Sequence, residues 1–105
     1  MSHLPVFLDI KDRIVLVVGG GEAAARRCEM VLKAGGRVRA IFADPELVMR
    51  DAATSDGVIL EERAFAPADL EGCALIFVAS EDEDLNVRVS DAAKAADIPV
   101  NVADR

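Results

Sequence analysis

Short apolar runs alternate with longer amphipathic stretches along this chain. The apolar, often β-branched runs predict buried strands at 13–18, 37–43, 58–60, 74–79 and 99–103. The stretches between them carry apolar residues at helical spacing together with helix start and stop signals, and they predict helices at 22–34, 46–53 and 80–96. The connection at 63–71 contains a helical turn that starts at Pro67. Strands that alternate with helices are typical of βαβ units and a parallel sheet.

Local signals predict where the helices begin and which faces they bury. Gly35-Gly36 is a C-terminal stop for the first helix. Asp44 before Pro45 is typical of an N-cap with proline at the first helical position, and Ser80 with Glu83 three residues later forms a capping box. The residues predicted to face inward are Ala24, Cys28, Val31 and Leu32 in the first helix, and Leu85, Val89, Ala92, Ala93 and Ala96 in the last.

The alternation predicts one α/β domain over residues 1–105. We expect a Rossmann-like three-layer α/β/α fold around a five-stranded parallel sheet of order 3-2-1-4-5. Before it, residues 4–10 are an apolar extended segment that forms an edge strand or packs across the sheet. In this strand order, ligands bind beyond the carboxyl ends of the strands, at the switch point between the first and fourth. The predicted positions at that edge are Gly19–Gly21, Ala43, Asp44, Ser80 and Asp104.

A glycine turn follows the first predicted strand directly. Gly19, Gly20 and Gly21 stand between that apolar run and a helix that opens at Glu22. With Ala24, they fit the pattern G-x-G-x-x-A, in which glycines let a pyrophosphate approach the unpaired N–H groups of a helix N-terminus. Glycine triplets also form ordinary turns, but four features that converge on one edge favour a nucleotide site.

The acidic residues near this turn have competing interpretations. Asp44 lies where dinucleotide folds place an acid on the adenosine ribose, which favours NAD over NADP, but it also fits a helix cap. The backbone N–H of Glu22 is expected to meet the cofactor while its carboxylate faces solvent. Ser80 is first a helix cap and second a hydroxyl on the nicotinamide side. Arg26 and Arg27 are interpreted as solvated surface charges that supply distant attraction at most.

The composition argues against several classes of binding partner. The net charge of −7 leaves no basic stripe for nucleic acid. The apolar share of 52%, with no Trp or Tyr, predicts an aliphatic core, and no apolar run approaches a membrane span. The N-terminus lacks the pattern of a signal peptide.

Cys28 and Cys73 have no metal-type spacing, so buried, reduced thiols in a cytoplasmic protein are expected in preference to a disulfide.

Three further polar features are weak or ambiguous candidates for a functional role. The acidic residues at 81–84 interact favourably with the dipole at a helix N-terminus. Because neighbouring helical residues point in different directions, no metal site is predicted there. His3 lies near the terminus and is a poor catalytic candidate. Asp104 ends the last predicted strand, where an aspartate is either a turn residue or a general base.

Two stretches of the chain resemble one known family. The stretch His3-Leu4-Pro5-Val6-Phe7, with Asp12-Arg13 leading into Val17–Gly21, is similar to the start of the siroheme synthase N-terminal module. Residues 87–93 and the stretch Asn101-Val102-Ala103-Asp104 are similar to later parts of it. The resemblance covers essentially the whole chain and is more specific than the glycine turn alone.

The resemblance implies an NAD-binding Rossmann domain of a bifunctional enzyme. Such an enzyme oxidises precorrin-2 to sirohydrochlorin with NAD and then inserts ferrous iron to give siroheme. Asp104 maps onto the family's proposed acid/base residue for both steps, which reverses its interpretation as a turn residue. The cofactor contacts implied by the resemblance are Gly19, Gly21, Glu22, Ala23, Ala43, Asp44 and Ser80.

One departure from the family concerns length. The family continues into a dimerisation segment and a helical region, whereas this sequence stops at Arg105. Precorrin-2 carries many carboxylates, so a domain of charge −7 is expected to need basic residues from the rest of a homodimeric enzyme. The chain alone is therefore expected to bind the cofactor without catalysing the reaction. Two alternatives stay open, a non-catalytic NAD-sensing module and an adenosylmethionine-binding fold.

Overall fold

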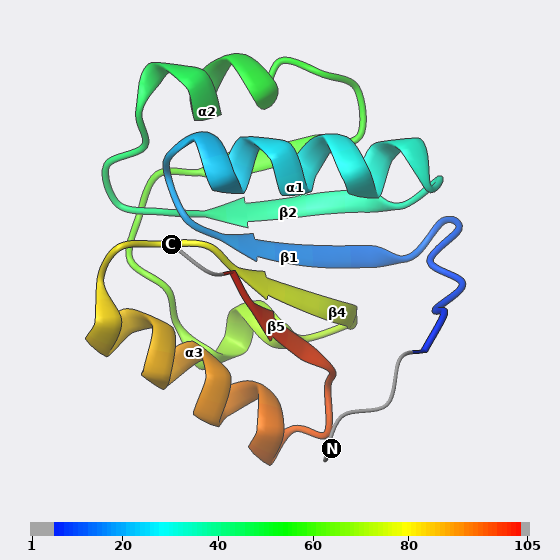
Figure 1. The fold of residues 1–105 in the computed structure, drawn as a ribbon, viewed down its shortest axis with the longest axis vertical. Coiled ribbons are helices and arrows are strands. Elements are labelled where there is room, and N and C mark those ends of the chain that lie inside the picture. The colour runs from blue at the N-terminus through cyan, green and yellow to red at the C-terminus, as the bar shows by residue number, and fades with distance from the viewer. Residues whose placement is uncertain (1–5, 104–105) are drawn as a thin grey trace.

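The computed structural model describes residues 6–103 and places five strands and four helical segments in strict alternation (Figure 1). The strands are β1 (Ile14–Val18), β2 (Arg37–Ile41), β3 (Val58–Glu61), β4 (Cys73–Val78) and β5 (Val100–Val102). The helices are α1 (Glu22–Lys33), α2 (Leu47–Ala52) and α3 (Glu83–Ala95), with a short 3-10 helix, η1 (Pro67–Leu70). Each predicted strand, helix and turn is present, with shifts of a few residues at the ends.

All strand pairs are parallel, and the sheet order is β3-β2-β1-β4-β5. This confirms the predicted fold class, a Rossmann-like sheet of order 3-2-1-4-5. Since β2 and β4 flank β1 on opposite sides, the connections that leave β1 and β4 at their carboxyl ends diverge, one to α1 on one face of the sheet and the other to α3 on the opposite face. That divergence is the switch point at which open α/β sheets bind ligands.

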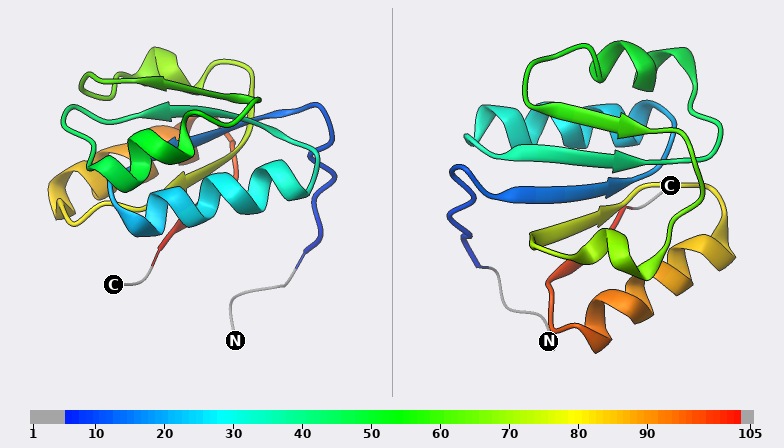
Figure 2. Two further views of the ribbon diagram at one scale, coloured as in Figure 1. Left: turned by 90° about the horizontal axis from the view of Figure 1, so that it is seen from above. Right: turned by 180° about the vertical axis from the view of Figure 1, so that it is seen from behind.

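Alternate residues of β1 face two separate apolar cores, which is why this strand is apolar throughout. Val15 and Val17 pack with residues of α1, and Leu16 and Val18 pack with residues of α3 and η1. Helices α1 and α2 thus cover one face of the sheet, while α3 and η1 cover the other (Figure 2). The three layers place α1 directly after the glycine turn.

Helix α2 begins later than the sequence predicts. Its first residue is Leu47 and its N-cap is Glu46, so the prediction of an N-cap at Asp44 is wrong. The reason is a contact from outside the helix. The backbone N–H of Glu46 donates to the carbonyl oxygen of Gly20 at 2.7 Å, which keeps the chain extended through the buried Pro45.

Helix α3 also begins later, because Ser80 is engaged elsewhere. The N-cap is Asp82, whose carboxylate accepts from the N–H of Leu85 at 3.1 Å, so the predicted capping box at Ser80 is wrong. At the other end, Ala96 is an exposed C-cap and does not face the core as predicted. Val89 and Ala93 are buried as predicted.

The segment before β1 forms no strand within its described part, residues 6–10. Of that part only Ile10 is buried, while Val6, Phe7 and Leu8 are exposed, so the predicted edge strand is wrong for these residues. Leu4 and Pro5 lie outside the described residues. Within 6–103, no helix is long and apolar enough to cross a membrane.

Candidate functional site

The glycine turn between β1 and α1 is closed in by backbone on one side. A Cβ atom on Gly19 would lie 2.3 Å from the carbonyl oxygen of Ala79 and 3.0 Å from the Cβ of Ala24. A Cβ on Gly20 would lie 2.3 Å from the ring of Phe42. Both positions therefore require glycine for packing. The small Ala24 fills the third motif position, which allows the close approach of helix and strand.

The N-terminus of α1 is open to an anion. Its N-cap is Gly21, which offers no side chain to the first N–H groups of the helix. The carboxylate of Glu22 is exposed and pairs with Arg26 at 3.2 Å, so it points away from the turn as the sequence predicts. The half-buried Ala23 follows it. Unpaired N–H groups beside glycine backbone fit the pyrophosphate of a dinucleotide.

Two carboxylates flank this turn, Asp44, which was a predicted site residue, and Glu46, which was not. Asp44 is exposed in the β2–α2 connection, next to the exposed Ala43. Glu46 is closer to the turn, because a Cβ on Gly21 would lie 2.6 Å from its Oε2 atom. No local motif predicts this contact, since it depends on the hydrogen bond between Glu46 and Gly20.

Ser80 lies at the carboxyl end of β4, where the sequence places it, but its hydroxyl is occupied. The buried Oγ donates to Oδ1 of Asn86 at 2.6 Å, and Nδ2 of Asn86 donates back to the carbonyl oxygen of Ser80 at 2.9 Å. The pair closes the β4–α3 turn. A contact of Ser80 with the cofactor stays a prediction.

Ala103 is the last described residue, and Asp104 lies outside the described residues. The N–H of Ala103 donates to the carbonyl oxygen of Val78, so the chain runs along the carboxyl end of β4 up to that point. Within 6–103 the predicted positions at 19–21, 43–44 and 80 all follow the carboxyl ends of adjacent strands. The role of Asp104 stays a prediction.

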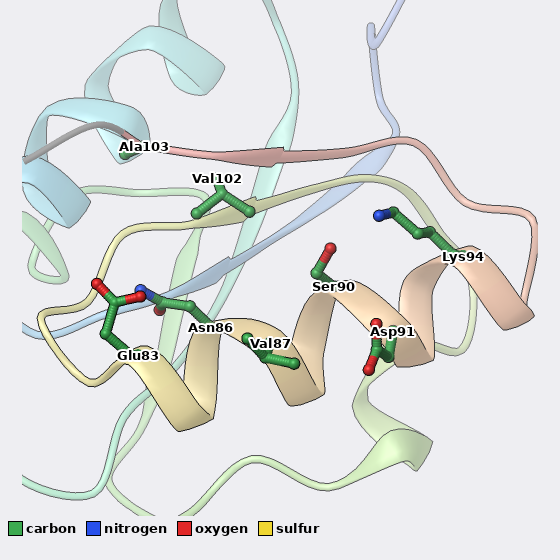
Figure 3. A pocket seen from close by; sticks show the side chains of 8 residues that line it. All are labelled: Glu83, Asn86, Val87, Ser90, Asp91, Lys94, Val102 and Ala103. Atoms are coloured by element: carbon green, nitrogen blue, oxygen red, sulfur yellow. The ribbon is translucent and has the colours of Figure 1, made fainter.

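A groove of about 470 Å³ lies between α3 and β5, away from the glycine turn (Figure 3). Ser90 and Lys94 point from α3 toward β5, and Val102 points back toward the helix. The remaining lining residues are Glu83, Asn86, Val87, Asp91 and Ala103. Across residues 6–103, no three His, Cys, Asp or Glu side chains gather to hold a metal ion.

The two cysteines are buried and free, as expected from their spacing. Burial raises the pKa of the Cys28 thiol to about 11. Burial also raises the pKa of Cys73, although the nearby Arg39 guanidinium opposes that shift. Neither thiol therefore has the lowered pKa of a reactive cysteine.

Comparison with known proteins agrees with this geometry. The family model NAD_binding_7, described as "Putative NAD(P)-binding", matches residues 6–105. Siroheme synthase of Ectopseudomonas mendocina (strain ymp) is 42% identical over 99% of this chain, and that of Pseudomonas aeruginosa (strain UCBPP-PA14) is 43% identical over the same share. The chain spans 22% of the length of each relative.

Two solved structures share the fold. The structure titled "SirC, precorrin-2 dehydrogenase" aligns with a TM-score of 0.79 and 28% identity, over 96% of this chain and 49% of that one. The structure titled "GenD2 from gentamicin A biosynthesis in complex with NAD" aligns with a TM-score of 0.61 and 23% identity, over 96% of this chain and 29% of that one. At that identity the second shows only the fold.

The sheet order, the open N-terminus of α1 and the glycine turn define a Rossmann-type dinucleotide-binding domain. The chain belongs to the NAD(P)-binding family whose model matches it from residue 6 onward. The resemblance to siroheme synthase is confirmed over 99% of the chain, and the family model confirms a nicotinamide dinucleotide as the cofactor, while the preference for NAD over NADP stays a prediction.

Proposed function

We propose that this chain is the NAD-binding domain of a siroheme-biosynthesis enzyme. That enzyme oxidises precorrin-2 to sirohydrochlorin with NAD and inserts ferrous iron to give siroheme. The observation that carries the proposal is the 42% identity to siroheme synthase across 99% of the chain. The fold shared with a structure titled as a precorrin-2 dehydrogenase, at a TM-score of 0.79, supports it.

The proposed cofactor contacts divide between the two halves of the turn region. The backbones of Gly19, Gly21, Glu22 and Ala23 hold the pyrophosphate, because the N-terminus of α1 has no side-chain cap. The segment 43–46 holds the adenosine, with its two carboxylates favouring NAD over NADP. Ser80 closes the nicotinamide end through its bond to Asn86. When bound, NAD supplies the acceptor for a hydride from the tetrapyrrole.

Asp104 is the proposed acid/base residue, carried over from the resemblance. It follows Ala103, whose N–H is anchored to the end of β4 at 2.8 Å. An aspartate after this anchored residue can accept the proton that the substrate loses as it is oxidised. The same carboxylate is proposed to accept pyrrole protons as ferrous iron, the second substrate, enters the macrocycle.

The proposed enzyme is larger than this chain. Residues 1–105 form one domain, and the rest of a homodimeric, cytoplasmic protein supplies the surfaces that complete the substrate site. This division fits the 22% of the siroheme synthases that the chain spans.

The test is Asp104→Ala in the parent protein. We expect the variant to keep its affinity for NAD and to lose both precorrin-2 oxidation and iron insertion. Asp84→Ala, a change of an exposed acid in the first turn of α3, is the matched control and should retain both activities. Unchanged turnover of Asp104→Ala would remove this residue from the mechanism.

A further inference from the structure

One face of β4 and β5 carries no helix within the described part of the chain. Phe77 and Ala103 pack against the α1-side core, and Asn101 pairs in register with Phe77 and is exposed. Helix α1 lies over β1 and β2, so it reaches this face only along one side (Figure 1). Arg27 and Met30 of α1 border it. We name these five residues the Arg27 face.

Arg27 is held on this face by an aromatic ring. Its guanidinium carbon lies 5.2 Å from the centroid of the Phe77 ring, within cation–π range. Within residues 6–103, its one side-chain hydrogen bond runs from Nη1 to the sulfur of Met30 at 3.5 Å, a weak acceptor. Its Nε is buried and has no hydrogen-bond partner. The Phe77 ring thus holds the Arg27 guanidinium in place, while most of its N–H groups donate no hydrogen bond within residues 6–103.

The neighbouring arginine shows the contrast. Arg26 pairs with Glu22 at 3.2 Å, and its side chain is 65% exposed. Arg27 forms no ion pair among residues 6–103, although the chain carries a net charge of −7. Nε is closed to a ligand because it is buried, so an incoming acceptor would bind the terminal Nη groups, of which Nη1 has only the weak bond to Met30. A carboxylate suits these donors, because the guanidinium fork binds carboxylates in a bidentate manner.

The position of Arg27 separates it from the pyrophosphate. Arg27 lies six positions after Gly21, which is about 9 Å along the helix axis at the usual rise. The pyrophosphate contacts proposed above lie at the start of the helix. Arg27 instead lies above β4 on the face that carries Ala103, the residue before the proposed acid/base group.

We propose that the Arg27 face is a subsite for the tetrapyrrole, in which Arg27 binds one of its side-chain carboxylates. This inference rests on the proposed function. Phe77, Met30 and Ala103 supply an apolar surface for the macrocycle, and Asn101 supplies an amide at its edge. The net negative charge of the chain repels the carboxylates of the tetrapyrrole. A cation that is already held in place next to the macrocycle offsets part of this repulsion. This role differs from the prediction that Arg27 is a solvated surface charge.

The test is titration of the parent protein, saturated with NAD and free of iron, with sirohydrochlorin as the probe. Arg27→Gln should weaken binding about tenfold, the loss expected for one charge-assisted pair. Arg27→Lys keeps the charge but not the fork, and it should fall between Arg27→Gln and the unchanged parent protein. Arg26→Gln removes the same charge one residue away and should change binding less than about twofold.

A second probe separates charge from stacking. The methyl ester of the same macrocycle has no carboxylates, so the unchanged parent protein and its Arg27→Gln variant should bind it equally. The inference is overturned if Arg27→Gln weakens sirohydrochlorin binding no more than Arg26→Gln does. Failure of the unchanged parent protein to bind NAD or sirohydrochlorin would instead contradict the proposed function. Circular dichroism and NAD affinity, both expected to be unaltered, show that each variant is folded.

Discussion

The three residues of the glycine turn are glycines for different reasons. Gly19 and Gly20 cannot carry a Cβ atom, which would lie 2.3 Å from the Ala79 carbonyl oxygen and the Phe42 ring respectively. Gly21 is different, since its Cβ would meet only the end of the Glu46 side chain, which can rotate away. The first two glycines therefore serve the fold, whereas the proposed role of Gly21 is to keep the helix N-terminus accessible to the ligand.

At the residue scale, the Glu46 carboxylate lies beside Gly21, and we propose that it belongs to the cofactor site. We expect Glu46→Gln to lower the ratio of the NADP dissociation constant to that of NAD by about fivefold, because one charge that repels the 2′-phosphate is removed. Asp44→Asn is the comparison variant, and its effect should be smaller because the carboxylate that lies against Gly21 is that of Glu46. Equilibrium titration with both nucleotides gives the ratio. A larger change for Asp44→Asn would assign the discrimination to the residue identified from sequence.

At the scale of elements, the β3–β4 connection is held by a buried aspartate. The carboxylate of Asp69 accepts two bonds from Arg63, at 2.6 and 3.0 Å, and one from the N–H of Ala66 at 2.8 Å. Arg39 of β2 donates to the carbonyl oxygens of Asp69 and Glu71 at 2.7 and 2.9 Å. These bonds tie η1 to the sheet. The hydrogen bonds from Arg63 hold the pKa of Asp69 below its usual range.

A lowered pKa makes this contribution dependent on pH. The pairing of Asp69 stabilises the fold above the unfolded-state pKa, about 3.9, and the benefit is lost as the pH falls through the lower folded-state value. Asp69→Asn should therefore cost about 1–2 kcal/mol in unfolding free energy at pH 7. The cost should shrink as the pH falls below about 4. Urea unfolding at several pH values measures it.

Asp84→Asn, the same substitution at an exposed position, is the control for effects of low pH that do not involve Asp69. A destabilisation by Asp69→Asn that is equal at pH 7 and in acid would contradict a role of its charge.

The elements show where sequence reasoning succeeds. The strands follow from local patterns, because β1 needs an apolar residue at each position to face two cores. The helix starts at Asp44 and Ser80 were predicted wrongly, because distant partners decide them. The carbonyl oxygen of Gly20 engages Glu46, and Asn86 engages Ser80. Neither partner can be identified from a capping motif.

At the scale of the whole molecule, the strand order predicts the position of the site better than any single motif does. Parallel strands of order 3-2-1-4-5 place 19–21, 43–46 and 80 beyond the carboxyl ends of adjacent strands. The contact of Arg27 with Phe77 could not be predicted in this way. It joins residues of α1 and β4, and it depends on how the helix lies across the sheet.

The central claim is that the chain binds NAD at the turn between β1 and α1. Isothermal titration of the 105-residue chain with NAD, NADP and adenosylmethionine tests it most directly, with Gly21→Asp as a variant that adds a negative charge at the N-cap. We predict one bound NAD per chain, weaker binding of NADP, no binding of adenosylmethionine, and loss of NAD binding in Gly21→Asp. Tighter binding of adenosylmethionine than of NAD, or NAD binding that Gly21→Asp leaves unchanged, would contradict the claim.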